Sequence, residues 1–430
     1  MKKRKFSFFS LGCKVNQAEM ESLSRFLLQN NWEIASINEK AHLCVINTCT
    51  VTNRADRKSR QKIRRVIKDN PGSFIIVTGC YAQAAKEEIK SISGVNLVID
   101  NSEKNRLSEI ISKRFLIGDT EKTGHIYSDF ISYGRTRTFL KIQDGCDNFC
   151  SYCIIPFVRG NPHSMPPEEV IKRIKSLTLA GYKEIVITGI NLGSYGKDFP
   201  LKFALTDLLN LICEKTPLER LRLSSIESLD INKAFLEMFN KYPVLCNHLH
   251  IPLQHGHNSI LHNMNRNYTV EQYREIINLA RERIKDLAIT TDVMVGFPGE
   301  KEEYFSSTRN FLQEMQLSKI HVFSYSPRKG TVAFNMKEQV SEEIKNERSR
   351  ILLELSKKMA GSFYRKFIGQ SLSVLFEHRL DKKTGLLKGL TTNYIPVTIE
   401  GRENCFGKIL MVNIIGLKEE ALFGEIISEQ

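Results

Sequence analysis

Three cysteines spaced as CxxxCxxC, Cys146, Cys150 and Cys153, constrain this chain more than any other feature of its sequence. Thiolates are the usual ligands of iron–sulfur clusters, and this tight spacing places three of them on one loop. Three ligands on a four-iron cluster would leave one iron open, as three-ligand zinc sites leave an open position. Zinc is the alternative, but its structural sites usually take four ligands, and no fourth Cys or His follows closely.

Strand-like and helix-like stretches alternate regularly through the middle of the chain. The predicted helix Pro166–Leu179, which starts with Pro-Pro and is followed by Gly181, is one of the crossovers between strands. Six such units predict a partial (β/α)6 barrel, and the cysteine loop after the first strand would lie at its C-terminal face, where such barrels place their chemistry. The predicted strands are Thr138–Gln143, Glu184–Ile190, Leu221–Ser225, His248–Leu253, Thr290–Val295 and Lys319–Tyr325.

The first third of the chain also alternates strands with helices, such as Gln17–Leu28 and Asn53–Lys68. This pattern predicts a parallel, doubly wound sheet, so the fold class is α/β. The predicted strands are Phe6–Leu11, Leu43–Asn47, Phe74–Thr78 and Leu97–Ile99.

The last part of the chain follows a charged helix predicted over Ser341–Phe367. Short runs in which apolar and polar residues alternate predict a small antiparallel β-barrel there. We therefore expect three units, residues 1–117, 132–366 and 367–430, with the polar stretch 118–134 as a linker between the first two. The runs are Ser373–Phe376, Tyr394–Ile399, Ile409–Val412 and Phe423–Ile427.

Cys13, Cys49 and Cys80 are far apart in the sequence, but each follows the end of a predicted N-terminal strand. Because the carboxyl ends of strands in an open parallel sheet line one crevice, we expect these cysteines to form a second three-thiolate site. The alternative is that they are unrelated core residues, since free cysteine is often buried. Cys44 fits that alternative, because it lies within a predicted strand.

Composition favours a reduced, cytoplasmic protein with no membrane association. Ten cysteines among 430 residues are far fewer than a disulfide scaffold carries, and there is neither an export signal nor an apolar run of about 20 residues. The clustered cysteines therefore indicate metal ligands or catalytic thiols. The net charge of +14 favours a polyanionic partner such as nucleic acid, and a merely basic surface is the alternative.

Basic residues crowd the predicted helix Asn53–Lys68, directly after Cys49, where Asp56 is the only acidic residue between Arg54 and Lys68. Such a helix beside the second cysteine site would bind nucleic-acid phosphates, and a solvated charged face is the alternative. The candidate phosphate ligands are Arg54, Arg57, Lys58, Arg60, Arg64 and Arg65.

The CxxxCxxC spacing, with Tyr152 before its third cysteine, resembles the radical S-adenosylmethionine (SAM) superfamily. The other cysteines lie in runs that look like the three motifs of the methylthiotransferase family: LGCKVNQ at 11–17, NTCTVT at 47–52 and TGCYAQ at 78–83. The resemblance covers nearly the whole chain, in the family's order of cluster domain, radical barrel and C-terminal TRAM domain. Residues 12–17 and 47–61 look specific to the branch that modifies threonylcarbamoyladenosine in tRNA.

This resemblance implies a reaction and its cofactors. The family places a methylthio group on C2 of an adenine at tRNA position 37, which already carries threonylcarbamoyl, in the anticodon loop. It uses two 4Fe–4S clusters, one generating a radical from S-adenosylmethionine and one carrying the sulfur that a second S-adenosylmethionine methylates. A base in a loop can be splayed out and read by stacking and edge contacts. An electron donor such as flavodoxin or ferredoxin is implied, and the sulfur source is not.

The resemblance also implies ligands for the cosubstrate at the ends of the barrel strands. Gly189 would let the backbone approach it closely, and the Glu227 carboxylate could accept its ribose hydroxyls. Arg159 would be a cationic contact to the nucleic acid, and no catalytic residue beyond the cluster cysteines is expected. The implied cosubstrate ligands are Tyr152, Gly189, Asn191, Ser225, Glu227 and Gln254.

Some positions depart from the family pattern. His163 and Met165 stand where arginines are usual, and Lys329 replaces a proline. His255 and His257 stand where small residues are usual, and without a third partner we interpret them as ordinary loop histidines. Two other functions stay open: a methylthiotransferase that acts on a ribosomal protein side chain, and a non-catalytic iron–sulfur RNA-binding protein.

Overall fold

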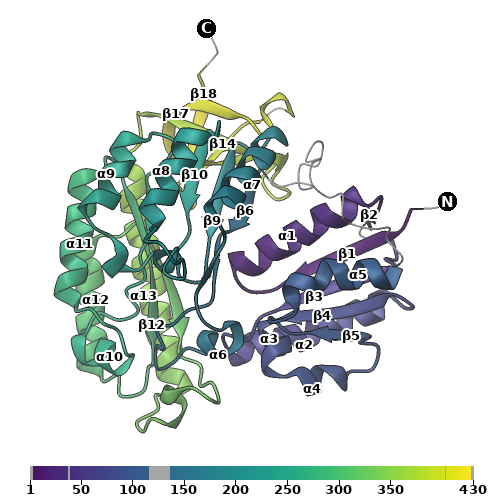
Figure 1. Ribbon diagram of the computed structural model, residues 1–430. Coiled ribbons are helices and arrows are strands. Elements are labelled where there is room, and N and C mark those ends of the chain that lie inside the picture. Colours follow the sequence, from purple (N-terminus) through teal and green to yellow (C-terminus); the bar gives the residue numbers. More distant parts are fainter. Residues whose placement is uncertain (1–2, 37–38, 116–135, 402, 428–430) are drawn as a thin grey trace.

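The computed structural model describes residues 3–36, 39–115, 136–401 and 403–427, and the predicted linker 118–134 lies outside them. Figure 1 shows an N-terminal sheet, a central set of strands ringed by helices, and a C-terminal barrel. The predicted α/β fold class is confirmed. Among the described helices, none combines the length and the apolar character that crossing a bilayer requires.

The N-terminal sheet is parallel, with the strand order β2-β1-β3-β4-β5. A doubly wound sheet of this order binds ligands at the carboxyl ends of its strands, where the strand order reverses, which here is between β1 and β3. All six residues of β3 are buried, as expected for a central parallel strand. The strands are β1 Lys5–Ser10, β2 Glu33–Ile34, β3 Leu43–Thr48, β4 Phe74–Gly79 and β5 Leu97–Ile99.

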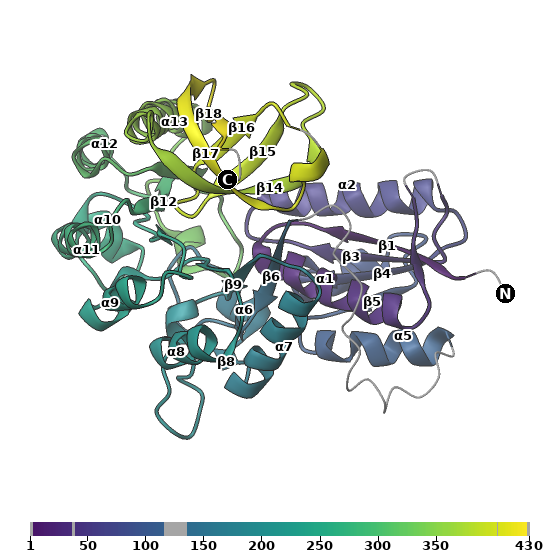
Figure 2. The same cartoon turned by 90° about the horizontal axis from the view of Figure 1, so that it is seen from above.

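Helices cover both faces of this sheet. Figure 2 shows α1 and α5 on one side and α2 on the other. The helix predicted from Gln17 begins at Lys14, because Cys13 takes the N-cap position. The helices are α1 Lys14–Gln29, α2 Asn53–Asp69, α3 Cys80–Ala84, α4 Lys86–Lys90 and α5 Leu107–Phe115.

The central unit is a partial barrel of six parallel strands in sequence order. Two sheets, β6-β9-β10 and β11-β12-β13, are joined by the isolated parallel pairings Leu221–Leu245 and Ser225–His250. The strands are β6 Arg137–Lys141, β9 Glu184–Thr188, β10 Arg220–Leu223, β11 His248–His250, β12 Ala288–Val295 and β13 Lys319–Ser324, with a small hairpin of β7 Gln143–Asp144 and β8 His163–Ser164. The helices are α6 Ile155–Arg159, α7 Pro167–Leu179, α8 Leu205–Lys215, α9 Lys233–Lys241, α10 Asn258–Asn263, α11 Val270–Arg283, α12 Glu302–Met315 and α13 Glu342–Arg365.

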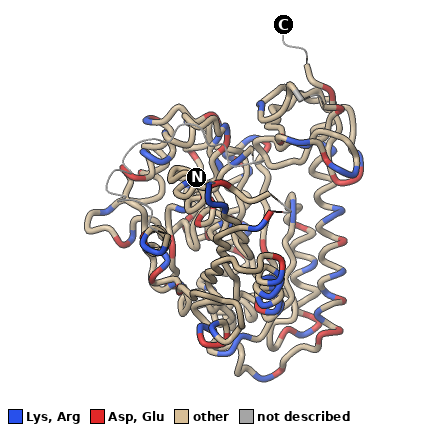
Figure 3. The backbone as a smooth tube through the Cα atoms, turned by 90° about the vertical axis from the view of Figure 1, so that its right-hand side faces the viewer, with Lys and Arg blue, Asp and Glu red and all other residues tan. Residues whose placement is uncertain are grey.

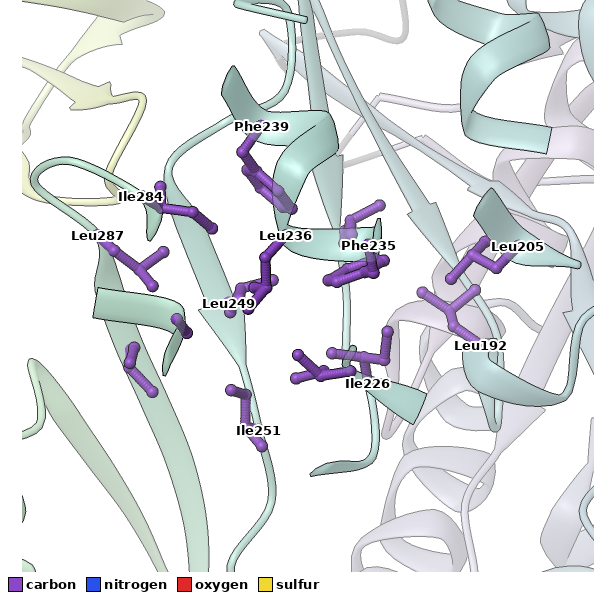
Figure 4. Packing of buried hydrophobic residues seen from close by; sticks show 14 of the residues in the cluster. Leu192, Leu205, Ile226, Phe235, Leu236, Phe239, Leu249, Ile251, Ile284 and Leu287 are labelled. Atoms are coloured by element: carbon purple, nitrogen blue, oxygen red, sulfur yellow. The ribbon is translucent and has the colours of Figure 1, made fainter. Parts of the chain in front are cut away.

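The apolar core of the barrel lies between its strands and the surrounding helices. Because side chains alternate along a strand, each strand faces the helices with one set and the barrel interior with the other. Figure 4 shows Leu249 of β11 packed beside Leu236 and Phe235 of α9. His248 and His250 of the same strand therefore point to the interior, which makes the interior polar.

The C-terminal unit is a closed barrel in the order β14-β15-β16-β18-β17. The prediction that this barrel is antiparallel is wrong for one pair, since β16 and β18 run parallel. The reason is geometric: up and down cannot alternate throughout a ring of five strands. One strand, β15, was absent from the predicted runs. The strands are β14 Ser371–Leu380, β15 Leu387–Thr391, β16 Pro396–Ile399, β17 Ile409–Lys418 and β18 Ala421–Ile426.

Both outer units contact the central barrel. Helix α1 packs along β6, an edge strand of the partial barrel (Figure 1). At the N-terminal end of β10, Arg220 donates to the Leu390 carbonyl at 3.0 Å, and Arg222 donates to the Thr391 carbonyl at 3.1 Å. The C-terminal barrel therefore covers the end of the central barrel opposite to the cysteine loop.

Candidate active site

Cys13, Cys49 and Cys80 follow the carboxyl ends of the adjacent strands β1, β3 and β4. Cys49 directly follows β3, and Cys80 is the first residue of α3. Gly12 has a φ of +91°, and a Cβ there would lie 2.7 Å from the Cys49 Sγ. Only glycine therefore lets these two loops approach so closely. Cys13 and Cys49 flank the reversal of strand order, where a doubly wound sheet binds its ligand, and Cys80 follows the next strand, β4.

Cys146, Cys150 and Cys153 lie on the loop between β7 and α6. Backbone hydrogen bonds fold this loop: the Cys146 N–H donates to the Gly160 carbonyl at 3.0 Å, and the Cys153 N–H donates to the Cys150 carbonyl at 2.9 Å. Phe149 between them has a φ of +45°, which is strained for a residue other than glycine. Strain of this kind collects at functional sites.

Arg159, the last residue of α6, joins the two sets of cysteines. Its Nε lies 3.3 Å from the Cys80 Sγ, and α6 begins two residues after Cys153. Its Nη1 lies 2.7 and 2.9 Å from the two carboxylate oxygens of Asp144, and its Nη2 lies 2.6 Å from the Asn16 Oδ1. The side chain is 1% exposed. Because its donors are used and buried, Arg159 is not placed to contact phosphate as expected, and it acts as an internal link.

Glu19 of α1 is the buried anion of the same link. Lys104 lies 2.7 Å from its carboxylate, Lys141 lies 2.9 Å from it, and Arg159 lies 3.3 Å from it. Burial alone raises the pKa of Glu19, but these three cations together outweigh burial and hold the pKa well below its usual range. The carboxylate therefore stays ionised and ties α1 and the N-terminal sheet to the first barrel strand.

Both cysteine sets fit iron–sulfur clusters by their donor chemistry. Each offers three thiols on loops at one end of a sheet, and thiolates are the usual ligands of such clusters. Burial raises the pKa of Cys49 to about 11 and that of Cys153 to about 12, so metal loading must displace protons from these thiols. Among the His, Cys, Asp and Glu side chains of the described ranges, no group of three is placed to hold one metal ion. The thiolates of a four-iron cluster bind different irons and lie farther apart.

Buried polar atoms without a protein partner lie after β9 and β10. The Asn191 Oδ1 and the Ser224 Oγ are buried and form no hydrogen bond within the described residues. Buried polar atoms are normally paired, so this mouth of the barrel fits a polar ligand. Gly189 has a local reason to be glycine, because a Cβ there would lie 2.7 Å from the Gln143 Oε1. That oxygen accepts the Asn191 N–H at 2.8 Å, so Gly189 makes room for Gln143.

Arg266 is a site residue that no sequence motif marks. Its guanidinium forms an ion pair with Glu227, and its Nη1 lies 3.4 Å from the Cys150 Sγ. The guanidinium carbon also lies 5.0 Å from the centre of the Tyr268 ring, and the side chain is 5% exposed. Arg266 therefore holds Glu227 against the cysteine loop. It follows α10 in an irregular stretch, where no periodic pattern marks it.

The other implied cosubstrate ligands lie around the same mouth. The Tyr152 ring packs edge-on against Phe297, with centroids 6.5 Å apart. Ser225 pairs with His250 just beyond β10. Gln254, after β11, has a φ of +64°, a second strained residue at this end of the barrel.

The basic residues of α2 divide into exposed and engaged ones. The helix packs on the sheet through Ser59, Ile63 and Val66. The Arg60 Nη1 lies 2.7 Å from the Tyr81 hydroxyl and 3.3 Å from Glu88, so this arginine is partly used within the protein. Basic and acidic residues are interspersed over most of the chain in Figure 3, whereas α2 carries eight basic and two acidic residues. The exposed basic residues are Arg54, Arg57, Lys58, Arg64, Arg65 and Lys68.

The histidines that depart from the family pattern make ordinary protein contacts. His255 is buried, with its Nε2 3.1 Å from a Glu300 carboxylate oxygen. His257 caps α10 and stacks on Tyr304 with ring centroids 4.1 Å apart. His163 is largely exposed. None of these three contributes to either cysteine site.

Comparisons with known proteins agree with this geometry. The model of the radical SAM superfamily matches residues 140–312, and that of Uncharacterized protein family UPF0004 matches residues 5–100. The chain is 40% identical to the threonylcarbamoyladenosine tRNA methylthiotransferase MtaB of Bacillus subtilis (strain 168), over 95% of this chain and 93% of that protein. It is 37% identical to the MtaB of Aquifex aeolicus (strain VF5), over 95% of this chain and 100% of that protein. It is 31% identical to the tRNA-2-methylthio-N(6)-dimethylallyladenosine synthase of Geobacillus kaustophilus (strain HTA426), over 99% and 83%.

Solved structures share the fold at low sequence identity. The radical S-adenosylmethionine methyltransferase TsrM from Kitasatospora setae has a TM-score of 0.57 at 14% identity, covering 77% of each chain. The cobalamin-dependent S-adenosylmethionine radical enzyme OxsB has a TM-score of 0.50 at 12% identity, covering 85% of this chain and 56% of that one. Relatives at up to 40% identity are matched over nearly their whole length. The chain therefore belongs to the methylthiotransferase family of radical SAM enzymes, which work with 4Fe–4S iron–sulfur chemistry and S-adenosylmethionine.

Proposed function

We propose that this protein adds a methylthio group to C2 of N6-threonylcarbamoyladenosine at position 37 of tRNA. Relatives named for threonylcarbamoyladenosine are 33% to 40% identical to this chain. Relatives named for the dimethylallyl adenosine are 31% to 33% identical, so the highest identities belong to the first group. The runs at 12–17 and 47–61 resemble the threonylcarbamoyladenosine branch as well, which supports the same substrate.

The observation that carries the proposal is the contact between Arg159 and Cys80, 3.3 Å from Nε to Sγ. It brings the end of α6 to the N-terminal cysteines, while the start of α6 lies two residues from Cys153. Five helical residues rise only about 7.5 Å, so the contacts at the two ends of α6 support a short separation between the two thiol sets. We propose that each set holds a 4Fe–4S cluster, because a reaction that makes a radical and delivers sulfur needs both functions close to one carbon.

Bound iron–sulfur clusters and S-adenosylmethionine would supply the radical and the methylated sulfur. The chain's own residues would position them. Arg266 orients Glu227, whose carboxylate would accept ribose hydroxyls, and the Asn191 Oδ1 and Ser224 Oγ, unpaired within the described residues, would offer further polar contacts. The buried pairs of Arg159 and Glu19 exclude water between the two sites, which protects a reactive intermediate from side reactions.

Helix α2 supports tRNA as the substrate, because its exposed face is basic and its first turn begins four residues after Cys49. Arg54, Arg57 and Lys58 lie at the end of the helix nearest the N-terminal cysteines. The chemistry also requires a one-electron donor, for which flavodoxin or ferredoxin is our proposal.

Counting iron tests the two-cluster arrangement. Anaerobically reconstituted protein should hold about eight irons per chain, as two four-iron clusters require. Replacing Cys13, Cys49 and Cys80 together by Ala should leave about four. A Cys213→Ala, Cys405→Ala double variant is the matched control and should keep the full content. A triple variant with unchanged iron content would disprove the second cluster.

Turnover on defined RNA tests the substrate. The reduced enzyme, with S-adenosylmethionine, is given anticodon stem-loops that carry either threonylcarbamoyladenosine or dimethylallyladenosine, and the nucleosides are analysed by mass spectrometry. We expect a methylthio product from the first RNA. A methylthio product from the second RNA alone would identify dimethylallyladenosine as the substrate in place of threonylcarbamoyladenosine. If neither RNA changes and a ribosomal protein is modified, the chain is a protein methylthiotransferase. If no 5′-deoxyadenosine is released, the non-catalytic iron–sulfur RNA-binding protein is favoured.

A further inference from the structure

The barrel interior contains a lysine that the proposed positioning of cofactors does not use. Lys14 is the first residue of α1, directly after Cys13, and it is half-buried. Its electrostatic neighbours are Tyr394, Arg222 and Asp292, which come from the C-terminal barrel, β10 and β12. Lys14 therefore reaches from the N-terminal unit into the central barrel, beside the edge strand along which α1 packs.

The other charged groups of the interior have partners. The Arg222 Nε lies 2.8 Å from one Glu184 carboxylate oxygen and its Nη2 lies 3.1 Å from the other. Arg137 lies 3.6 Å from the same carboxylate. The Asp292 carboxylate lies 3.2 Å from the His250 Nε2. Both anions of the interior are thus engaged by groups other than Lys14.

Lys14 itself forms no hydrogen bond or ion pair with the residues that the structure describes. Lys14, Arg137, Arg220 and Arg222 are four cations, and Glu184 and Asp292 are two anions. An ammonium group that is partly withdrawn from water without a counter-charge is unfavourable. The interior therefore carries an excess of positive charge and is complementary to an anionic ligand.

An exposed aromatic ring lies on the same interior surface. Phe323 of β13 is 48% exposed, unusual for a phenylalanine in a strand. It lies on the same face as His321, whose ring centroid is 5.5 Å from that of His250. An exposed aromatic side chain is the platform on which proteins stack an unpaired base. The interior thus offers a flat apolar surface as well as an unpaired cation.

We infer that Lys14 binds the carboxylate of the threonylcarbamoyl group while Phe323 stacks on the adenine that carries it. The inference rests on the proposed function and adds the residue that selects the substrate. A dimethylallyl group brings no charge, so it would leave the Lys14 ammonium unpaired. Since Lys14 adjoins Cys13, an anchor at this residue would keep the modified base beside the N-terminal cysteines.

Binding of two matched RNA probes tests the role of Lys14 without relying on turnover. One anticodon stem-loop carries threonylcarbamoyladenosine, and the other carries its carboxamide analogue, in which the carboxylate is neutral. Reconstituted wild-type protein should bind the carboxylate probe at least about tenfold more tightly, as expected for a hydrogen bond to a charged group. Lys14→Met should bind both probes equally. Lys172→Met, the same change on the exposed face of α7, should keep the wild-type preference.

Further variants separate charge from stacking and from folding. Lys14→Arg keeps the charge and should keep most of the preference for the carboxylate probe. Phe323→Ala should weaken the binding of both probes alike. Iron content is measured for every variant, because Lys14 adjoins a cluster cysteine. Retention of the carboxylate preference in Lys14→Met, or its loss in Lys14→Arg with full iron content, would overturn the inference. If the wild-type enzyme methylthiolates only the dimethylallyl RNA, the proposed function fails separately.

Discussion

Arg159 shows how much of this site depends on single buried charges. Replacing it by Met removes hydrogen bonds to Cys80, Asn16 and Asp144 and leaves buried carboxylates with fewer partners. We expect a loss of about 3 kcal/mol in the free energy of unfolding, measured by urea denaturation. Arg350→Met removes only an exposed pair with Glu354 on α13 and should cost less than about 0.5 kcal/mol. Equal effects of the two changes would contradict the internal role of Arg159.

His321 makes stability depend on pH. Burial, with His250 nearby, lowers its pKa from 6.5 to about 4, and Asp292, Lys319 and Lys14 are its other charged neighbours. Between these values the unfolded chain binds the proton and the folded chain does not, so stability falls as pH drops from about 6.5 to about 4.

Thermal unfolding at pH 7, 6 and 5 checks this dependence. His321→Asn should lose less stability than the wild type over this range, because the asparagine does not titrate. His262→Asn, on the exposed side of α10, is the control and should follow the wild-type curve. Parallel curves for wild type and His321→Asn would show that His321 does not contribute.

The sequence predicts cysteines at this scale better than it predicts their partners. Cys146, Cys150 and Cys153 are marked by spacing, and Cys13, Cys49 and Cys80 by their position after strands. Arg159 and Arg266 carry no such mark, because their partners lie far away in the sequence: Asn16 is 143 residues from Arg159, and Cys150 is 116 residues from Arg266. A basic residue in a sequence does not reveal whether its charge faces water or a buried carboxylate.

Helix α2 is the element whose function is most directly testable. Arg57→Glu with Arg64→Glu reverses two exposed charges on the face away from the sheet. If both contact phosphates, tRNA affinity should fall and its logarithmic salt dependence should flatten by about one unit per residue. Binding is measured over a series of potassium chloride concentrations. Arg350→Glu on α13 is the matched control. An unchanged salt dependence in the double variant would mean that α2 is a solvated charged face that does not contact phosphates.

Helices and strands with strong local sequence patterns were predictable. The pairing of strands that depends on closing the C-terminal barrel was not. Apolar spacing and the Thr52 cap define α2 as Asn53–Asp69, one residue longer than predicted. The parallel pairing of β16 with β18 follows from closing a ring of five strands, a condition that no local sequence pattern records. The packing of Gly189 against Gln143 was not predictable either, because Gln143 comes from another element.

At the scale of the whole molecule, the site depends on how the N-terminal unit is docked. Arg328, after β13, donates to the Asn53 Oδ1 at 3.0 Å, to Asp56 at 2.6 Å and to the Thr50 hydroxyl at 2.6 Å. Together with Arg159 it ties the N-terminal unit to both edges of the partial barrel. The relative position of the two cysteine sets therefore depends on a few polar contacts between units that are separated in sequence.

Loosening this docking should be visible by hydrogen exchange. Arg328→Met should speed amide exchange in residues 50–56 and leave the strands β9 and β10 unchanged, because only the contacts to Thr50, Asn53 and Asp56 are lost. Lys329→Met changes the adjacent, exposed residue and should leave exchange as in the wild type. Identical exchange in both variants would show that Arg328 does not hold the units together.

The most direct test of the proposed activity is nucleoside mass spectrometry of bulk tRNA from cells with and without this gene. We expect that 2-methylthio-N6-threonylcarbamoyladenosine disappears without the gene and that its unthiolated precursor accumulates. Restoring the gene should restore the nucleoside, and restoring a Cys80→Ala variant should not. Unchanged tRNA in the deletion strain would contradict the proposed tRNA substrate and would favour a protein substrate.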